Sequence, residues 1–458
     1  MQLPVSFIKS IENVKGFDKE AFEKVHQSGE QITSIRFNPN KVTSNLQPPT
    51  LNLQQKVPWS SNGYYLSDRP SFTSDPIFHA GAYYVQEASS MFLEEVMRQT
   101  IDLTKPLRVL DLCAAPGGKS TLIQSIISSD SLLVSNEVIK TRVNILTENI
   151  TKWGASNVIV TNNDPKDFQS LQNYFDVIVV DAPCSGSGLF RKDTDAIHEW
   201  SEQNVQLCSQ RQERILADVL PSLKDDGVLI YSTCSYSEKE DEEILDKILE
   251  MHEAQSLPIQ LNAVWGIVET ISPIHKATGY RFYPDKVKGE GFFIAAIRFK
   301  KINSDNIKKH NSKSSIEKIS KAEIDVITKT IQNSANYFYI KQNDEAIAVP
   351  KYFENDLLFI QTSLYIKKAG VRLGSIIRGE LIPHHELAMC MGMETFFPKW
   401  DVDEHTALQY LRKNDIKLDA DVKGWVRIAY SNFVLGWVKI LPNRLNNYYP
   451  KEWRILNK

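Results

Sequence analysis

The chain has 458 residues, of which 42% are hydrophobic and 24% charged, a composition typical of a globular protein with two or three domains. No apolar run reaches the length of a membrane-spanning helix, and the first residues lack a secretory signal, so we expect a cytoplasmic protein without a membrane partner. The five cysteines are an odd number, which argues against a disulfide framework, and none falls in a CxxC pair, which argues against structural zinc. We therefore expect free thiols and no bound metal.

Charge is distributed unevenly along the chain. The net charge is only −3, but residues 299–458 carry 25 Lys and Arg against 18 Asp and Glu. A basic C-terminal part beside an acidic body suits contacts with nucleic-acid phosphates. An asymmetry of this size also arises by chance in a large protein, so charge alone leaves a nucleic-acid partner open.

Residues 1–75 form a predicted N-terminal extension, and residues 76–299 a predicted α/β domain. In the extension we expect a helix over 17–26 and a Pro-, Asn- and Gln-rich loop over 45–69. In the domain, short apolar runs alternate with amphipathic stretches, which indicates a mostly parallel sheet covered on both faces. The predicted strands are 108–113, 131–137, 158–161, 176–180, 228–232 and 291–299, and the predicted helices are 120–128, 140–153, 204–223 and 238–252.

The composition changes after the α/β domain. Residues 300–322 are rich in Lys, Asn and Ser and are predicted to be a linker. In residues 323–458, glycines and β-branched residues, for example at 375–380 and 424–440, predict a compact β-rich module. Trp425, Trp437 and Tyr449 lie among its basic residues, an arrangement that suits RNA stacking but also the core of a small β fold.

The first strand of the α/β domain leads into a turn of small residues, where backbone amides can approach a ligand at a helix N-terminus. The second strand ends at Glu137, whose carboxylate can accept hydrogen bonds from both hydroxyls of a ribose. Asp164, after the third strand, can hold an adenine amino group or be an exposed turn residue. The turn matches neither GxGxxG nor GxxxxGK[ST], which argues against a dinucleotide or ATP. The candidate cofactor contacts are Cys113, Ala114, Ala115, Pro116, Gly117, Gly118, Lys119, Glu137, Arg142, Asp164 and Asp181.

Two further strands end in cysteines, Cys184 after the strand 176–180 and Cys234 after 228–232. The carboxyl ends of neighbouring parallel strands meet at one edge of the sheet, where open α/β sheets bind substrates. A thiolate that adds to carbon 6 of cytosine makes carbon 5 nucleophilic enough to take a methyl group. Such chemistry also needs a carboxyl group at cytosine N3, for which Asp181 is the candidate, and Lys119 can lower a thiol pKa or orient the base.

A lone cysteine at a strand end is usually only buried. We apply this interpretation to Cys113, Cys208 and Cys390. It is harder to apply to two cysteines in small-residue loops at the same edge of one sheet.

These motifs together resemble those of the S-adenosyl-L-methionine-dependent RNA cytosine-5 methyltransferases, which include bacterial ribosomal enzymes. The resemblance implies a Rossmann-like fold with a seven-stranded sheet, Cys234 as the nucleophile, and Cys184 as the residue that promotes breakdown of the covalent adduct. The sequence departs from the family pattern at Asp285, where a His commonly follows the Pro. The shared stretches are LCAAPGGKS at 112–120, DAPCSGSG at 181–188, YSTCS at 231–235 and HAGAYYVQEASSM at 79–91.

Residues 435–450 resemble, more weakly, the PUA-like RNA-binding region of the ribosomal members. This favours small-subunit ribosomal RNA as the substrate of a monomeric enzyme, with transfer RNA as the alternative. Two other classes stay open. A catalytically silent ribosome-assembly factor is disfavoured because both cysteines, Asp181 and Lys119 are present, and a nicotinamide-dependent oxidoreductase is disfavoured by the missing GxGxxG.

Overall fold

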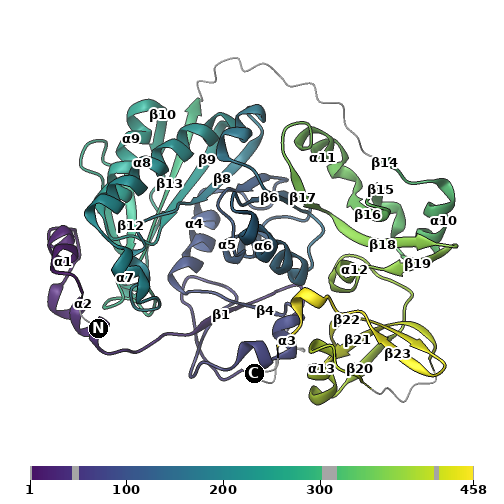
Figure 1. Cartoon of the computed structure of the whole chain (residues 1–458). Helices are drawn as coiled ribbons and strands as arrows, with labels where there is room; N and C mark the ends of the chain where they lie inside the picture. Colours follow the sequence, from purple (N-terminus) through teal and green to yellow (C-terminus); the bar gives the residue numbers. More distant parts are fainter. Residues whose placement is uncertain (1–2, 44–50, 302–316, 417–421, 457–458) are drawn as a thin grey trace.

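Figure 1 shows the computed structural model, which describes residues 3–43, 51–301, 317–416 and 422–456. A ten-stranded sheet crosses the molecule in the order β11-β12-β13-β9-β8-β5-β6-β7-β17, and β10 pairs with β13. The parallel strands are β5 (Arg108–Asp111), β6 (Leu132–Asn136), β7 (Val158–Thr161), β8 (Phe175–Asp181) and β9 (Leu223–Thr233). The antiparallel strands are β10 (Glu253–Ser256), β11 (Val268–Ile271), β12 (Thr278–Phe282), β13 (Phe292–Lys301) and β17 (Ile366–Ala369).

The expected seven-stranded sheet is confirmed in strands β5 to β9, β12 and β13. The sheet is mixed rather than mostly parallel, because β10 and β11 extend one side and β17 is added beside β7. β17 comes from the C-terminal part of the chain, and two of its four residues are lysines, so periodicity did not reveal it.

Alternate residues of the parallel strands pack on opposite faces of the sheet, as expected for strands buried on both sides. Val109 and Leu133 pack with one group of helices, whereas Leu110 and Val134 pack with the other. The first group is α4 (Leu93–Thr100), α5 (Gly118–Ile126) and α6 (Lys140–Trp153), and the second is α8 (Glu202–Val219), α9 (Glu242–Met251) and α11 (Glu354–Ile360). The four helices predicted in this domain are confirmed, with α9 beginning later because a short 3-10 turn precedes it.

The N-terminal extension begins with two helices and continues into a sheet of order β2-β3-β1-β4. Because β4 belongs to this sheet, the extension continues past residue 75, where it was predicted to end, as far as the residue before Ser89. The helix predicted over 17–26 is confirmed, whereas the loop predicted over 45–69 is wrong for β2 and β3. Most of β2 is exposed at the edge of its sheet, so its sequence LQQK has no apolar alternation to indicate a strand; residues 44–50 lie outside the described chain. The elements are α1 (Val5–Ile11), α2 (Lys19–Gln27), β1 (Ser34–Phe37), β2 (Leu53–Lys56), β3 (Gly63–Leu66), α3 (Pro76–His79) and β4 (Tyr83–Val85).

The C-terminal region contains two sheets in place of one β-rich module. The first is β14 (Glu317–Lys318), β15 (Tyr337–Gln342), β16 (Glu345–Pro350), β18 (Val371–Ile377) and β19 (Glu380–Pro383), with α10 (Lys321–Thr330) and α12 (His385–Met389) nearby. The second is β20 (Lys399–Val402), β21 (Gly424–Tyr430), β22 (Phe433–Leu441) and β23 (Arg444–Asn447), with α13 (Glu404–Leu411). β14 lies inside the predicted linker, of which residues 302–316 lie outside the described part. Trp425, Trp437 and Tyr449 are buried, which supports their interpretation as core residues.

The C-terminal region packs directly against both preceding parts of the chain. Arg108 at the start of β5 donates two hydrogen bonds of 2.7 Å to the Asp356 carboxylate. One apolar core contains Ile35 and Ile77 of the extension together with Ile428 and Leu435 of the second C-terminal sheet. The three parts therefore share cores. Within the described chain, no helix is long and apolar enough to cross a membrane.

Candidate active site

Two cavities of about 420 and 580 Å³ lie at the carboxyl ends of the parallel strands. The smaller cavity is also lined by Tyr84, Gln86 and Glu87 from the extension, and the larger by Glu137 and Asp164. The two cavities share part of their lining, so they are adjoining parts of one cleft. The shared residues are Cys113, Ala115, Arg142, Asp181, Leu189 and Cys234.

The turn of small residues after β5 forms one wall of this cleft. Ala114 donates its backbone N–H to the Asn136 carbonyl, which joins the turn to the end of β6. Gly117 has a φ of 116°, in the left-handed region that favours glycine, and it shapes the start of α5 without lining either cavity. The predicted contacts of this turn that do line the smaller cavity are Cys113, Ala114, Ala115, Pro116, Gly118 and Lys119.

The larger cavity has the features that a nucleoside needs. The Glu137 side chain is buried, and its Oε1 accepts a hydrogen bond of 2.9 Å from the Ile139 backbone N–H. Arg142 lies 3.5 Å from the Glu137 carboxylate and donates to the Ala115 carbonyl. Val138 and Ile139 are 52% and 47% exposed beside this carboxylate, and such an apolar surface suits an adenine ring.

The loop after β7 is held by a segment of the C-terminal region. Asn163 donates from Nδ2 to the Tyr365 carbonyl at 3.0 Å and accepts from the Tyr365 N–H at 2.9 Å. The neighbouring Asn162 donates its side-chain amide to the carbonyls of Glu137 and Val138. Asp164, next in the chain, caps a short 3-10 helix and lines the cavity. The backbone before β17 therefore supports the two loops that carry Glu137 and Asp164.

The two predicted cysteines meet at the junction of the cavities. The Sγ atoms of Cys184 and Cys234 lie 2.8 Å apart, and all the cysteines are free thiols. The hydrogen bond with Cys234, together with burial, raises the pKa of the Cys184 thiol well above its usual value. Cys184 therefore favours its neutral form, which can donate a hydrogen bond to a thiolate at Cys234.

Asp181 and Lys119 form an ion pair beside the cysteines. Lys119 Nζ lies 2.8 Å from Asp181 Oδ2, and Ser232 donates to Oδ1 at 2.8 Å. The Asp181 side chain keeps 37% of its surface exposed, so its carboxylate can accept a further donor from a ligand in the cleft. Lys119 also lies 5.0 Å from the centroid of the Phe292 ring, which limits where its ammonium group can move.

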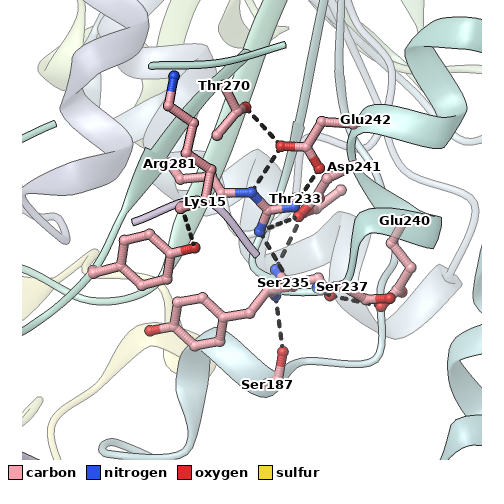
Figure 2. Close-up of polar contacts among 12 residues, drawn as sticks. Lys15, Ser187, Thr233, Ser235, Ser237, Glu240, Asp241, Glu242, Thr270 and Arg281 are labelled. Carbon is pink, nitrogen blue, oxygen red and sulfur yellow. Dashed lines mark hydrogen bonds and ion pairs between the residues drawn. The ribbon is translucent and has the colours of Figure 1, made fainter. Parts of the chain in front are cut away.

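A run of three buried carboxylates after the Thr-Cys motif was missed by sequence reasoning (Figure 2). The residues from Glu240 to Glu242 fall within the charged helix predicted over 238–252, and all three side chains are buried. Asp241 accepts a 2.6 Å hydrogen bond from Thr233, and Arg281 forms ion pairs with both Asp241 and Glu242. The only sequence signal was the position of this run directly after the motif, since acidic runs are usually solvated.

Asp285, where the sequence departs from the family pattern, and Glu290 have different positions relative to the cleft. The Asp285 side chain is buried, lies 3.1 Å from the Lys286 ammonium, and lines neither cavity. Glu290 lines the smaller cavity, and its pKa is raised to about 7 because the side chain is buried. Among the described residues, no group of His, Cys, Asp and Glu could hold a metal ion.

Three family models match the chain, and all belong to one family. "16S rRNA methyltransferase RsmB/F" matches residues 99–298, the "N-terminal domain of 16S rRNA methyltransferase RsmF" matches 3–88, and the "Methyltransferase RsmF PUA domain" matches 397–455. Between 298 and 397 these models match nothing, although β17 and Tyr365 lie there.

Curated relatives match over most of the chain. "Ribosomal RNA small subunit methyltransferase F" of Vibrio vulnificus is 28% identical over 409 residues, which cover 86% of this chain and 84% of the relative. The protein of the same name from Shewanella loihica is 28% identical over 439 residues, which cover 92% of this chain and 88% of the relative.

Solved structures have the same fold. A methyltransferase homolog protein from Pyrococcus horikoshii has a TM-score of 0.51 and 28% identity, covering 65% of this chain and all of its own. NSun6 from Pyrococcus horikoshii, solved with SFG, has a TM-score of 0.53 and 19% identity, covering 65% of this chain and 99% of its own, which shows the fold alone. With the cysteine pair, the cofactor cleft and the three matching models on one chain, the protein belongs to the RsmB/F family of S-adenosylmethionine-dependent RNA methyltransferases.

Proposed function

We propose that the protein transfers a methyl group from S-adenosylmethionine to carbon 5 of a cytosine in small-subunit ribosomal RNA, through a covalent adduct with Cys234. The observation that carries this proposal is the 2.8 Å contact between Cys184 and Cys234 where the two cavities join. The names of the curated relatives support ribosomal RNA as the substrate. We place the protein in the cytoplasm as a monomer whose partner is ribosomal RNA or the small subunit.

The larger cavity is the proposed cofactor site. Glu137 accepts hydrogen bonds from the ribose hydroxyls, and Asp164 accepts one from the adenine amino group. Arg142 keeps the Glu137 carboxylate and the Ala115 carbonyl in place. When bound, the cofactor supplies an electrophilic methyl group at the side of the cavity that Cys113, Asp181 and Cys234 line.

The smaller cavity is the proposed site of the target base. The Cys234 thiolate adds to carbon 6, forming a C–S bond, and the electron pair of the C5–C6 double bond becomes available at carbon 5. As the C–S bond forms, N3 takes up a proton from water, and the Asp181 carboxylate accepts a hydrogen bond from the resulting N3–H, so that negative charge does not build up on the ring. Lys119 orients the Asp181 carboxylate through its 2.8 Å contact.

Breakdown of the adduct needs loss of the carbon 5 proton to a base and departure of the Cys234 sulfur with the C–S electron pair. A neutral thiol at Cys184 can donate a hydrogen bond to the departing Cys234 thiolate and so stabilise it. We therefore assign promotion of this step to Cys184 and nucleophilic attack to Cys234.

The extension and the second C-terminal sheet are the proposed RNA-binding parts. Because Trp425, Trp437 and Tyr449 are buried in the core, base stacking on these rings does not supply affinity. The excess of basic residues after residue 298 supplies phosphate contacts instead.

Methyl transfer from radiolabelled S-adenosylmethionine to purified small subunits, 16S ribosomal RNA and transfer RNA tests this function. Nuclease digestion and mass spectrometry of the product should reveal 5-methylcytosine in the ribosomal RNA. Label in transfer RNA alone would contradict the substrate, a methyl group on another atom would contradict the chemistry, and no label in any RNA would identify a silent factor.

A further inference from the structure

Among the described residues, Glu240 is the one side chain outside the two cysteine loops that is hydrogen-bonded to both. Its Oε1 accepts from the Ser185 backbone N–H at 2.7 Å, and its Oε2 accepts from the Ser185 hydroxyl at 2.6 Å. Oε2 also accepts from the Ser235 hydroxyl at 2.6 Å. Ser185 follows Cys184 and Ser235 follows Cys234, so one buried carboxylate joins the residues next to both thiols.

Glu240 is itself held firmly by the body of the domain. Tyr231 on β9 donates its hydroxyl to the Glu240 carbonyl at 2.7 Å, and Gln212 on α8 donates to Glu240 Oε1 at 3.4 Å. The same Gln212 amide donates at 3.0 Å to the carbonyl of Pro183, the residue before Cys184. Glu240 is therefore tied to α8 through its carboxylate and to β9 through its backbone carbonyl.

The other neighbour of Cys234 has a separate anchor. Thr233 donates to Asp241, which pairs with Arg281, and Arg281 pairs in turn with Glu242 (Figure 2). This anchor fixes β9 but makes no hydrogen bond to the Cys184 loop. The two loops also meet directly, because the Gly188 N–H donates to the Cys234 carbonyl at 2.8 Å and the Tyr236 N–H donates to Ser187 Oγ at 3.0 Å. These contacts lie away from the thiols, whereas the Glu240 carboxylate is bonded to the residue that follows each cysteine.

We propose that Glu240 is a positioning residue that holds Cys184 against Cys234 and thereby acts on breakdown of the RNA adduct. The inference rests on the proposed function. Cys234 alone forms the C–S bond, so loss of Glu240 should affect attack only moderately. Breakdown depends on the hydrogen bond from Cys184, which fails if the two loops move apart by a fraction of an ångström. Loss of Glu240 should therefore reproduce the effect of losing the Cys184 thiol.

The test is a denaturing gel of the full-length protein after turnover with S-adenosylmethionine and ribosomal RNA, which reveals the fraction of protein trapped on RNA. Glu240→Ala should slow breakdown about tenfold or more and raise the trapped fraction toward that of Cys184→Ala. Glu240→Gln keeps an acceptor for the Ser185 N–H but lacks the charge, so its trapped fraction should be intermediate. The double variant Glu240→Ala/Cys184→Ala should trap no more than Cys184→Ala alone, because both changes remove one interaction.

Glu242→Gln is the matched control, because it weakens a neighbouring buried ion pair that has no bond to the Cys184 loop. It should lower the melting temperature without raising the trapped fraction, which separates positioning from general destabilisation. If Glu240→Ala does not fold, Glu240→Gln carries the test. A wild-type trapped fraction in Glu240→Gln, or equal trapping by Glu242→Gln, would overturn the inference. Absence of methyl transfer by the wild-type protein would instead overturn the proposed function.

Discussion

The cysteine side and the cofactor side of the active cleft are held in place by different kinds of contact. On the cysteine side, a buried carboxylate within the same domain accepts hydrogen bonds from both loops. On the cofactor side, neutral amide hydrogen bonds join Asn163 to the backbone of Tyr365, which is 202 residues away in the sequence. Charge-assisted bonds are shorter and stronger than neutral ones, so the cysteine side is the more rigid of the two.

This difference fits the tasks of the two sides. A thiol can donate a hydrogen bond to a leaving sulfur only within a narrow range of distances between the two sulfur atoms. A bound nucleoside, in contrast, tolerates small shifts of the loops around it. The cofactor side also depends on a part of the chain that was predicted to lie beyond a linker. We therefore expect loss of the C-terminal region to weaken cofactor binding as well as RNA binding.

The largest effect is expected where the cleft must stabilise charge on the base. Asp181→Ala should lower the rate of methyl transfer in a single turnover by about 10²–10³-fold, because it removes the carboxylate that we propose to hold N3. Asp176→Ala is the control, since Asp176 lies at the other end of β8 and pairs with Lys224. A rate for Asp181→Ala within a few-fold of that for the control would refute the role of Asp181.

A smaller effect is expected from the direct cofactor contact. Glu137→Ala should raise the dissociation constant of S-adenosylmethionine about tenfold or more, because charged hydrogen bonds to a ligand contribute about 1.5–3 kcal/mol. Isothermal titration calorimetry measures this dissociation constant. Glu148→Ala is the control, because Glu148 lies on α6 and pairs with Lys152. Equal affinities for the two variants would show that Glu137 does not bind the ribose.

The smallest effect is expected from the contact with the C-terminal region. Asn163→Ala removes two neutral hydrogen bonds to Tyr365, each of which contributes about 1 kcal/mol. Because these bonds position the loop and do not contact the cofactor, only part of this free energy should appear in binding, and the same dissociation constant should rise about threefold to tenfold. Tyr352→Phe is the control, because its hydroxyl joins the two regions at Ser129, a contact remote in sequence from the cofactor loops. If both variants bind the cofactor like the wild type, the two sides of the cleft are not coupled to the C-terminal region as we describe.

The motifs and the central sheet could be predicted from the sequence because their signals are local. The parallel strands are continuous apolar runs, and the cofactor turn and both cysteines follow them directly, so topology places them at one edge. β17 could not be predicted, because IKKA becomes a strand only through its pairing with β7, more than 200 residues earlier. The burial of Glu240 could not be predicted, because an acidic side chain is buried only where it finds donors such as Ser185, which comes from the end of another strand.

The division of labour between Cys234 and Cys184 is the central claim, and a denaturing gel of protein, RNA and cofactor after reaction tests it most directly. Cys184→Ala should still attack and methylate the base but release it slowly, so a covalent protein–RNA band should accumulate. Cys234→Ala should form no such band and no 5-methylcytosine, because no thiolate remains to add to carbon 6. A covalent band with Cys234→Ala and none with Cys184→Ala would reverse the two roles and contradict the account.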